Sequence, residues 1–299
     1  MERNKAEMKN VVKAVIPVAG FGTRFLPYTK AVPKMMLPII DKPVLQVIVE
    51  EAAASGIEEI LFIVGYRSEI IKDYFAENVE LKSRLADKNA SDYVSGLEKL
   101  CNRVKFYFTE QKEQLGTAHA ISLAEQFVNG QPFLLMFGDD LMYTEGETVS
   151  SQLISAYCHT GKTVLGCKRV SEADIVKYAS CEYDGNDGRV YNLTKIIEKP
   201  AENEVKSTLA PLGRYVCTPD IFDYIRKIGK GKNGEYQITD AFDLQAADSR
   251  VVAYEFEGSR YDTGDKLGYL KAVVDYALKD EKLGEDFLEF LKSTVSEKN

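Results

Sequence analysis

Glycines and cations follow the first apolar run of the chain, and this combination is suited to binding phosphate. The run 14–19 ends at Gly20 and Gly22, and Arg24 and Lys34 come soon after. Glycines in a turn after a strand let backbone N–H groups approach a phosphate closely. Arg can hold two oxygens at once, whereas Lys acts as a point charge. These residues favour a triphosphate-binding loop over an ordinary strand-to-helix turn with solvated cations.

The loop matches neither of two common nucleotide-binding motifs. Phe25 stands where a dinucleotide-binding loop, G-x-G-x-x-G, needs its third glycine. The sequence G-K-[ST] of a P-loop does not follow either. The question is therefore which other kind of loop holds a phosphate here.

Carboxylates also follow strand-like runs. Asp139 and Asp140 end one apolar run, and Asp262 and Asp265 lie near the end of the last one. Carboxylate oxygens are the hard ligands that Mg²⁺ prefers, usually one or two from the protein together with phosphates and water. Asp139 and Asp265 are therefore a candidate Mg²⁺ pair. The alternative for Asp262 or Asp265 is capping of the helix expected to follow.

An acid and a base stand side by side at Glu198 and Lys199, before Pro200. Consecutive residues of a regular strand point to opposite faces, so both could not line one pocket there. At a strand end before proline this geometry relaxes. Glu198 could then accept hydrogen bonds from sugar hydroxyls while Lys199 meets a phosphate. An exposed strand edge is the alternative.

Histidine and cysteine chemistry has little support in the sequence. His119 lies in an apolar helical stretch and is expected to be structural, and His159 has no informative neighbours. The five cysteines are scattered, with no C-x-x-C, so we expect buried thiols and neither a zinc site nor a disulfide framework. G-x-S-x-G is also absent from the sequence.

Strand and helix patterns alternate through the first half of the chain. We expect strands near 13–20, 58–66, 104–111 and 132–140, and helices near 43–55, 68–75 and 116–127. The strands are almost entirely apolar, as is typical of a parallel sheet with helices on both faces. The alternation predicts an α/β, Rossmann-like fold: a doubly wound, mostly parallel mixed sheet flanked by helices. Ligands of such sheets bind beyond the carboxyl ends of the strands, where the candidate residues lie.

We expect a single domain over residues 1–299, in which the remaining segments are additions to the central sheet. Two Asp-Gly pairs suggest a β-hairpin part near 163–216, and a late strand is expected at 251–264. Residues 76–100 are charged and helix-prone, which indicates a helical excursion from the sheet. Two C-terminal helices are expected near 266–293.

Composition narrows the class of protein. Of 299 residues, 45% are hydrophobic and 28% charged, as in ordinary globular proteins. The net charge of −8 argues against a nucleic-acid partner, although a small phosphorylated ligand needs only a local basic pocket. No apolar run approaches the roughly 18–20 residues that span a membrane. The polar start MERNKAEMKN lacks the apolar core of a secretory signal, so we expect a cytoplasmic protein.

Several motifs, taken in order, resemble the sugar-1-phosphate nucleotidylyltransferases, and in particular their bacterial uridylyl branch. They extend from about Lys13 to about Leu278: GFGTRFLPYTKAVPKMMLPIIDKP, EQLGTAHA, IIEKP, GRYV, GEYQITDA and YDTGDKLGY. The resemblance implies a fold of the nucleotide-diphospho-sugar transferase type. The first loop then resembles the G-x-G-T-R loop of that family, which wraps a nucleoside triphosphate attacked at its α-phosphorus.

The resemblance implies a reaction. A uridylyl group is transferred from UTP to glucose 1-phosphate, giving UDP-glucose and pyrophosphate. The resemblance also implies Mg²⁺ as the cofactor, with Asp139 and Asp265 expected to bind it. The sugar phosphate is the nucleophile and is already ionised at pH 7, so alignment and charge neutralisation replace a strong base. The family further implies a homodimer or homotetramer built partly from peripheral helices.

The resemblance also assigns nucleotide-binding residues. Ala19 and Gly20 are expected to contact the base or ribose, with Gly22 in the same loop. Gln111 and Gly116 are expected to contact the edge of the uracil.

Roles in catalysis and sugar binding follow in the same way. Arg24 and Lys34 are expected to hold the triphosphate, and Lys199 the phosphate of the sugar. Glu198 and Gly213 are expected to bind the glucose hydroxyls.

Three departures from the family pattern keep other specificities open. Met35 replaces a polar residue that follows the lysine in the family, and Ala179 replaces a common glycine near the sugar. FGDD at 137–140 resembles the thymidylyl pattern more than the uridylyl one. A transferase for another nucleotide or sugar is therefore an alternative, and a non-catalytic binder of nucleotide sugars is another. Retention of the candidate catalytic and metal residues argues against the latter.

Overall fold

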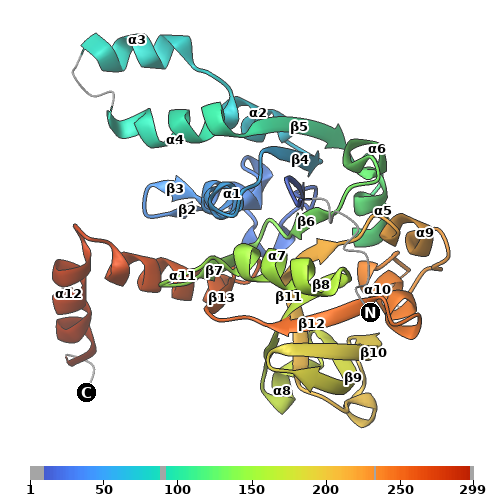
Figure 1. Ribbon diagram of the computed structural model, residues 1–299. Coiled ribbons are helices and arrows are strands. Elements are labelled where there is room, and N and C mark those ends of the chain that lie inside the picture. Colours follow the sequence, from blue (N-terminus) through green and yellow to red (C-terminus); the bar gives the residue numbers. More distant parts are fainter. Residues whose placement is uncertain (1–9, 88–91, 232–233, 297–299) are drawn as a thin grey trace.

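The computed structural model describes residues 10–87, 92–231 and 234–296 of the chain. Its central feature is a nine-stranded sheet, counted over these described residues, in the order β5-β4-β1-β6-β11-β8-β12-β10-β9 (Figure 1). The bounds of these strands are β1 Lys13–Pro17, β4 Glu59–Val64, β5 Lys105–Glu110, β6 Phe133–Met136, β8 Thr163–Arg169, β9 Ala179–Asp187, β10 Val190–Glu198, β11 Leu209–Cys217 and β12 Val251–Glu255.

The sheet is mixed but mostly parallel, as predicted. Parallel pairing joins β5, β4, β1 and β6, and it also joins β8 and β12. Strands β11 and β10 are antiparallel to both of their neighbours. Among the described strands of this sheet, these two alone run against the rest.

Alternate residues of the central strands enter two separate hydrophobic cores. Ala14 and Ile16 of β1 belong to one core, and Val15 between them belongs to the other. Successive residues of a strand point to opposite faces, so each face needs its own apolar cover. Leu45 of α1 and Leu153 of α7 pack into the first core, and α5 and α10 contribute to the second. Helices therefore cover both faces, as the apolar strands predicted.

The helices lie close to the expected ranges. Their bounds are α1 Val44–Ala54, α2 Ser68–Phe75, α3 Val79–Asp87, α4 Asp92–Arg103, α5 Thr117–Ser122, α6 Glu125–Val128, α7 Val149–Thr160, α8 Glu172–Ile175, α9 Ile221–Ile225, α10 Ile238–Ala247, α11 Lys266–Lys279 and α12 Gly284–Ser296. Helices α3 and α4 form the predicted excursion and project beyond the sheet, and α11 and α12 form a second arm (Figure 1). Within the described ranges, no helix combines the length and the apolar character needed to cross a bilayer.

Two expectations about local structure need correction. The helical stretch 116–127 is two short helices, α5 and α6, rather than one. The late strand 251–264 is divided into β12 and β13 (Ser259–Asp262), and β13 pairs with β7 (Asp140–Tyr143) in a separate two-stranded sheet. This division brings the end of β13 beside the end of β6, where the candidate carboxylates lie.

The two Asp-Gly pairs have different roles in the hairpin. Gly188, at φ +57°, forms the turn between β9 and β10. Asp184 lies within β9 at a break in register, because Gly185 pairs with Asn192 and Tyr183 pairs with Leu193. An extra residue on one strand is a β-bulge, which bends the strand. Only one of the two pairs therefore makes a turn within the described hairpin.

A minor two-stranded ribbon, β2 Pro38–Ile39 and β3 Lys42–Pro43, leads into α1. It follows three single turns of 3₁₀ helix at 23–25, 28–30 and 34–36, which come directly after the glycine loop and include Lys34. A fourth 3₁₀ turn occupies 202–204 after β10. The loop after β1 is therefore a folded segment and not an extended coil.

Candidate active site

The order of the strands places a crevice beside β1. The chain passes from β1 to β4 on one side and later returns to β6 on the other side of β1. Loops leave the carboxyl ends of β1 and β6 in opposite directions at such a switch point, which opens a space for a ligand. The glycine loop follows β1, and Asp139 follows β6.

A pocket of about 330 Å³ lies at this crevice. It is within the size range of small-ligand sites. Its walls bring together residues from the loops after β1, β5 and β6: Pro17, Ala19, Gly20, Lys34, Met35, Gln111, Gln114, Gly116, Thr117, Ala120, Phe137, Asp139 and Glu235. Six of the residues predicted from the sequence are in this set. We call it the first pocket.

Gly22 supports the first pocket from behind. Its φ is +64°, and a Cβ there would lie 2.9 Å from Cβ of Lys34. The hydroxyl of Thr29 donates a hydrogen bond to the Gly22 carbonyl at 2.8 Å. A residue without a side chain is needed for the lysine segment to lie this close to the loop. Gly22 thus fixes the position of Lys34. Gly22 itself is not among the described residues that line the first pocket.

Amide side chains form the far end of the first pocket. Gln111 is buried, and its Nε2 donates to the Gly116 carbonyl at 3.2 Å and lies 3.1 Å from Nδ1 of His119. Gln114 donates to the Ala19 carbonyl at 2.9 Å and so joins the loops after β5 and β1. An amide offers both donors and an acceptor, as the edge of a base requires. His119 supports Gln111, in keeping with the structural role predicted for it.

Lys34 and Asp139 form an ion pair at the opposite end of the first pocket from the amide side chains. The Lys34 Nζ lies 2.5 Å from Oδ2 of Asp139. Burial by itself would raise the pKa of Asp139, but the charge of Lys34 and its hydrogen bond outweigh burial, so the pKa is lowered. The carboxylate is therefore ionised, and a cation and an anion stand together where the loop after β1 meets the end of β6.

Arg24 and Asp265 lie at the edge of the crevice rather than among the described lining residues. The Arg24 Nη1 donates to the Gly264 carbonyl at 3.2 Å. Oδ2 of Asp265 accepts hydrogen bonds from the backbone N–H groups of Leu267, at 3.0 Å, and Gly268, at 3.1 Å. These two hydrogen bonds lower the pKa of Asp265, and the bond from Gly268 has the larger effect. Asp265 is thus the N-cap of α11, the alternative considered from the sequence.

The loop that carries Asp265 is nevertheless bonded to Asp139. The backbone N–H and the hydroxyl of Thr263 both donate to the Asp139 carbonyl, at 2.8 and 2.7 Å. A Cβ on Gly264 would lie 2.8 Å from Oδ2 of Asp139 and 3.0 Å from Oδ1 of Asp262. Carboxylate oxygens of Asp139 and Asp262 therefore both lie close to Gly264. From the sequence, Asp262 was considered only as a cap.

A second pocket, of about 190 Å³, adjoins the first and shares Thr117 and Phe137 with it. Its walls come mainly from β11, the start of α10 and the residues that lead into β9: Asp140, Lys177, Tyr178, Ala179, Glu198, Pro211, Leu212, Gly213, Tyr215, Gln237, Ile238, Thr239 and Arg260. Glu198 and Gly213, the residues predicted for the sugar, are both in this wall.

The end of β10 breaks the strand alternation, as the proline suggested. Lys199 has φ +43°, and its Nζ lies 3.9 Å from Oε1 of Glu198, so both side chains are on the same side. Oε2 of Glu198 accepts a hydrogen bond from the Thr239 hydroxyl at 3.1 Å. Burial raises the pKa of Glu198. The exposed-edge alternative is wrong for Glu198, which lines the second pocket, whereas the half-exposed side chain of Lys199 lies next to Glu198 but is not among the described residues of that wall.

Gly213 allows close contact between β11 and Asp140. Its φ is +64°, and an added Cβ would lie 2.1 Å from Oδ2 of Asp140. The Gly213 N–H donates to the hydroxyl of Tyr215 at 3.1 Å, and the Gly213 carbonyl accepts from the Phe137 N–H at 2.9 Å. This position therefore requires glycine for two independent reasons.

Gly213→Ala is expected to lower the free energy of unfolding by at least about 2 kcal/mol. The left-handed backbone alone costs an alanine about 1–2 kcal/mol, and displacement of the Asp140 carboxylate adds to that. Urea denaturation of both proteins measures the difference. Gly185→Ala is the matched control, because a Cβ there meets nothing within 4 Å. Equal stabilities of the two variants would contradict the tight contact.

Arg260 lines the second pocket, although nothing in the sequence assigned it a role. The Arg260 Nε donates to Oδ1 of Asp140 at 2.6 Å, and its Nη1 donates to the hydroxyl of Tyr178 at 3.0 Å. Burial raises the pKa of Asp140 to about 6, although the charge of Arg260 opposes this. The motif YDTG had drawn attention to the aspartates of this loop and not to the arginine just before it.

Comparison with known proteins adds a family match. A family model described as nucleotidyl transferase matches residues 13–279. That range contains every residue predicted for the site and both pockets.

Curated relatives match over nearly the whole chain. A protein of Staphylococcus saprophyticus named UTP–glucose-1-phosphate uridylyltransferase 2 is 44% identical over 285 residues, which are 95% of this chain and 98% of the relative. A UTP–glucose-1-phosphate uridylyltransferase of Staphylococcus epidermidis is 41% identical over 285 residues, 95% of this chain and 99% of the relative.

Solved structures share the same architecture. A UDP-glucose pyrophosphorylase complexed with UDP-glucose is 35% identical with a TM-score of 0.83, covering 90% of this chain and 100% of the other. A UTP-bound enzyme of the same type from Acinetobacter baumannii is 32% identical with a TM-score of 0.85, covering 94% of this chain and 98% of the other.

Proposed function

The chain belongs to the nucleotidyl transferase family, and we propose that it transfers a uridylyl group from UTP to glucose 1-phosphate, forming UDP-glucose and pyrophosphate. The observation that carries this proposal is the pair of adjoining pockets that share Thr117 and Phe137. One offers amides and a cation suited to a nucleotide, and the other offers Glu198, a partly buried carboxylate suited to sugar hydroxyls. The names of the relatives and the ligands of the related structures support the same reaction.

The proposed chemistry is a displacement at the α-phosphorus of UTP. A phosphate oxygen of glucose 1-phosphate forms a new P–O bond, and the bond from the α-phosphorus to the oxygen bridging to the β-phosphate breaks. Pyrophosphate leaves with that oxygen and its electron pair. The attacking phosphate is already ionised, so no side chain has to remove a proton. The chain's residues therefore act by alignment and by neutralising charge.

In this proposal the first pocket holds UTP. The backbone at Ala19 and Gly20 contacts the ribose or base, and Gln111 and Gly116 contact the uracil edge. Lys34 lies between the glycine loop and Asp139, which supports a role beside the triphosphate. Arg24, whose guanidinium reaches the carbonyl of Gly264, neutralises charge from the outer edge of the crevice.

The second pocket holds glucose 1-phosphate. Glu198 accepts hydrogen bonds from sugar hydroxyls, and its bond from Thr239 supports a fixed orientation. The backbone at Gly213 contacts the sugar directly, since no Cβ intervenes. Lys199 binds the sugar's phosphate from the mouth of the pocket, on the side that Glu198 faces.

We propose that Mg²⁺ is the cofactor, with Asp139 and Asp265 as its protein ligands. Two carboxylates fit this ion, which prefers hard oxygen ligands and takes few of them from a protein. Hydrogen bonds from Thr263 to Asp139 hold the two segments together. The position of Asp262 beside Asp139 makes it an additional candidate ligand. When bound, the ion would supply positive charge to the phosphates of UTP.

Pyrophosphate release tests the proposed function. The protein is incubated with Mg²⁺, glucose 1-phosphate and one of UTP, dTTP, CTP, ATP or GTP, and pyrophosphate is measured. We expect the highest kcat/KM with UTP. A clear preference for dTTP would replace the proposal with the thymidylyl alternative, which the FGDD sequence at 137–140 favours. No release with any nucleotide would support a non-catalytic binder.

Met35 is expected to weaken discrimination among pyrimidine nucleotides. It lines the first pocket and is only 3% exposed, and its thioether is a poor hydrogen-bonding group. Met35→Glu should add a group that only accepts hydrogen bonds, which suits the N3–H of uracil but not the unprotonated N3 of cytosine. One net hydrogen bond contributes about 1 kcal/mol, so the ratio of kcat/KM for UTP over CTP should rise about fivefold. Met35→Leu controls for the change of shape. If the ratio of kcat/KM for UTP over CTP were the same in both variants, residues other than residue 35 would discriminate between the two nucleotides.

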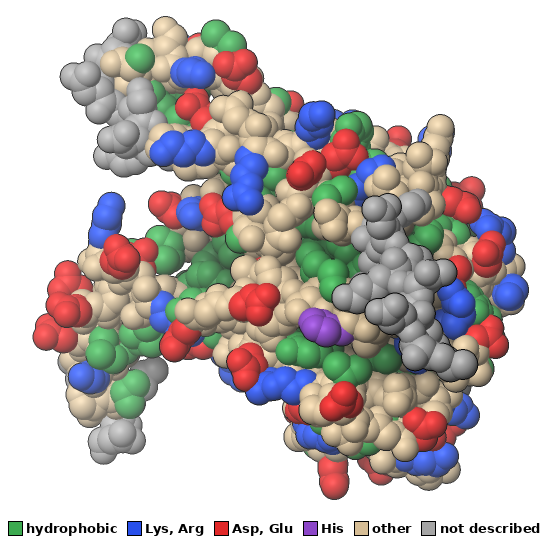
Figure 2. All heavy atoms as spheres, in the orientation of Figure 1, with side chains coloured by type: hydrophobic (Ala, Val, Ile, Leu, Met, Phe, Trp, Pro, Cys, Tyr) green, Lys and Arg blue, Asp and Glu red, His purple; other side chains and the backbone are tan. Residues whose placement is uncertain are grey.

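We also propose that the protein is a homodimer or homotetramer that associates through α11 and α12. Figure 2 shows hydrophobic side chains gathered on this arm. The exposed apolar residues of the two helices are Leu267, Leu270, Leu288, Phe290 and Val295. Such a cluster on one projecting arm is more than a monomer surface requires.

Light scattering of the protein without substrates tests this association. We expect a mass of at least two chains, and a mass of one chain for the double variant Leu270→Glu/Phe290→Glu, because two buried charges would oppose contact. Leu81→Glu on α3 is the control, since Leu81 is an exposed leucine of the other arm. A monomeric wild type at micromolar concentration would rule out the oligomer. Dissociation by Leu81→Glu alone would move the interface to α3 and α4.

The proposed substrates are small soluble phosphates, which supports a cytoplasmic location. The net charge of −8 supports the absence of a nucleic-acid partner.

A further inference from the structure

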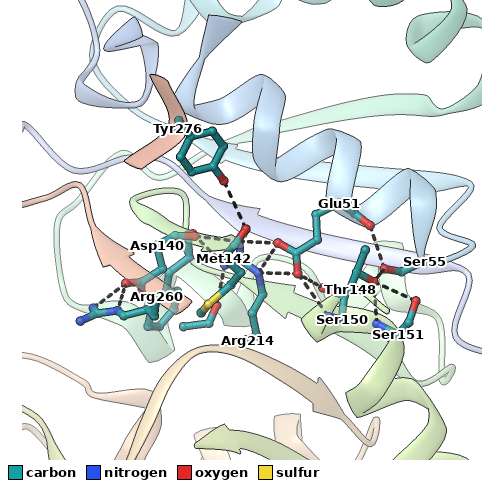
Figure 3. Close-up of polar contacts among 12 residues, drawn as sticks. Glu51, Ser55, Asp140, Met142, Thr148, Ser150, Ser151, Arg214, Arg260 and Tyr276 are labelled. Carbon is teal, nitrogen blue, oxygen red and sulfur yellow. Dashed lines mark hydrogen bonds and ion pairs between the residues drawn. The ribbon is translucent and has the colours of Figure 1, made fainter. Parts of the chain in front are cut away.

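Arg214 lies at the centre of a buried polar network (Figure 3). Its side chain is fully buried in β11, one residue after Gly213. Its Nη2 and Nε donate to Oε2 of Glu51, at 2.9 and 3.1 Å, so α1 supplies the opposite charge. Burying a guanidinium is costly unless every N–H finds an acceptor. The remaining contacts of this side chain therefore matter.

Those contacts go to three backbone carbonyls. The Nη1 donates to Gly213 at 3.0 Å and to Phe137 at 3.4 Å, and the Nη2 donates to Asp140 at 2.7 Å. With the two bonds to Glu51, these account for all five N–H groups of the guanidinium. A planar fork can satisfy this arrangement, whereas the ammonium of a lysine has only three donors.

The three carbonyls belong to both halves of the site. Phe137 and Asp140 bracket the turn that presents Asp139 to the first pocket. Gly213 belongs to the wall of the second pocket. The turn has little freedom of its own, because a Cβ at Gly138 would lie 2.7 Å from Val18. One guanidinium thus fixes both ends of this turn against the strand that carries Gly213.

We propose that Arg214 is a positioning residue for the transfer reaction. By holding the 137–140 turn against Gly213, it sets the distance between the Asp139 end of the first pocket and the sugar in the second. That distance determines how the phosphate oxygen of the sugar meets the α-phosphorus of UTP. The inference rests on the proposed function, because it assumes that the two pockets hold the two reactants.

Glu51 anchors this arrangement to the rest of the fold. Its Oε1 accepts a hydrogen bond from the Ser150 hydroxyl at 2.6 Å and from the Ser150 N–H at 3.2 Å, at the start of α7. Residues of α1 and α7 therefore hold the Glu51–Arg214 ion pair in place. No residue of these two helices is among the described residues that line the two pockets. A purely structural ion pair would affect stability and all steps of catalysis alike. A positioning residue should affect the alignment of the sugar phosphate more than the binding of UTP.

Arg214→Lys tests the role of the fork. The charge opposite Glu51 is kept, but two of the five donors are lost. A misplacement of about 1 Å can reduce the rate by about 100-fold. We expect kcat/KM for glucose 1-phosphate to fall by about 100-fold, while the Kd of UTP, measured by calorimetry, changes less than about threefold. The double variant Glu51→Gln/Arg214→Met removes both charges without leaving either one unpaired, and should show the same split.

Ser150→Ala is the matched control. It removes a buried hydrogen bond to the same Glu51 but touches none of the three carbonyls. All proteins are assayed well below their unfolding midpoints, which circular dichroism provides. Ser150→Ala should lose stability and keep both kinetic constants close to wild type.

The outcomes separate the inference from the proposed function. An inactive wild type would overturn the proposed function itself. An active wild type with folded Arg214 variants of unchanged kcat/KM would overturn the inference alone. Equal losses in UTP affinity and in kcat/KM for glucose 1-phosphate would reduce Arg214 to a structural ion pair, and would overturn the positioning role as well.

Discussion

Asp139→Asn is expected to lower kcat by about 1,000-fold or more, with little change in fold. Such a loss corresponds to about 4 kcal/mol of transition-state stabilisation. The substitution keeps the size of the side chain but removes the charge that pairs with Lys34 at 2.5 Å. It also removes a proposed ligand of Mg²⁺, and such ligands commonly contribute several kcal/mol. Pyrophosphate release under saturating substrates measures the change.

Two further substitutions identify the second acid. Asn caps a helix about as well as Asp, so Asp265→Asn should keep the cap of α11 and change turnover more than stability, whereas Asp262→Asn changes the acid beside Asp139. Comparison of their Mg²⁺ dependence shows which one completes the site. Asp184→Asn, on the exposed hairpin, is the control for loss of a surface carboxylate. Near-normal turnover of Asp139→Asn would exclude this residue from the reaction.

Lys199→Met is expected to reduce kcat/KM for glucose 1-phosphate by about 100- to 1,000-fold. Loss of one positioned cation or donor at a reacting oxyanion commonly costs this much. The Kd of UTP should stay close to wild type, because the lysine lies next to Glu198 of the second pocket and the proposed UTP site is the first. Initial rates over a range of glucose 1-phosphate concentrations provide the measurement.

Lys206→Met is the control for the loss of a lysine. Lys206 is also exposed and pairs with Glu182 at 3.2 Å, but it lies outside both pockets. Its substitution should leave the kinetics unchanged, since exposed ion pairs contribute little. A similar loss of activity in both variants would show a general effect of charge and would remove Lys199 from the sugar-phosphate site.

The fold could be predicted because its signals are local. Apolar runs of strand length, separated by helical patterns, specify a doubly wound sheet, and the two cores beside β1 follow from side chains that alternate between faces. The glycine loop could be predicted for the same reason. Gly20 and Gly22 mark a turn directly after the first strand, whatever the rest of the chain does.

Other features depend on partners far away in the sequence. Arg214 contacts Glu51 across 163 positions, and Arg260 contacts Asp140 across 120. A charged residue inside an apolar strand carries no local sign of its partner, so its burial could not be predicted. Asp262 was missed as a neighbour of Asp139 because its position depends on where β12 ends and β13 begins. That break is set by the pairing of β13 with β7.

The most direct test of the account uses glucose 1-phosphate carrying ¹⁸O at its three non-bridging phosphate oxygens. The labelled sugar phosphate is incubated with unlabelled UTP, Mg²⁺ and the wild-type protein, and the products are examined by mass spectrometry. Attack of the sugar phosphate on the α-phosphorus predicts UDP-glucose that retains all three labels, with equimolar unlabelled pyrophosphate. Label in pyrophosphate or orthophosphate, or UTP consumption that yields no UDP-glucose, would contradict the proposed uridylyl transfer.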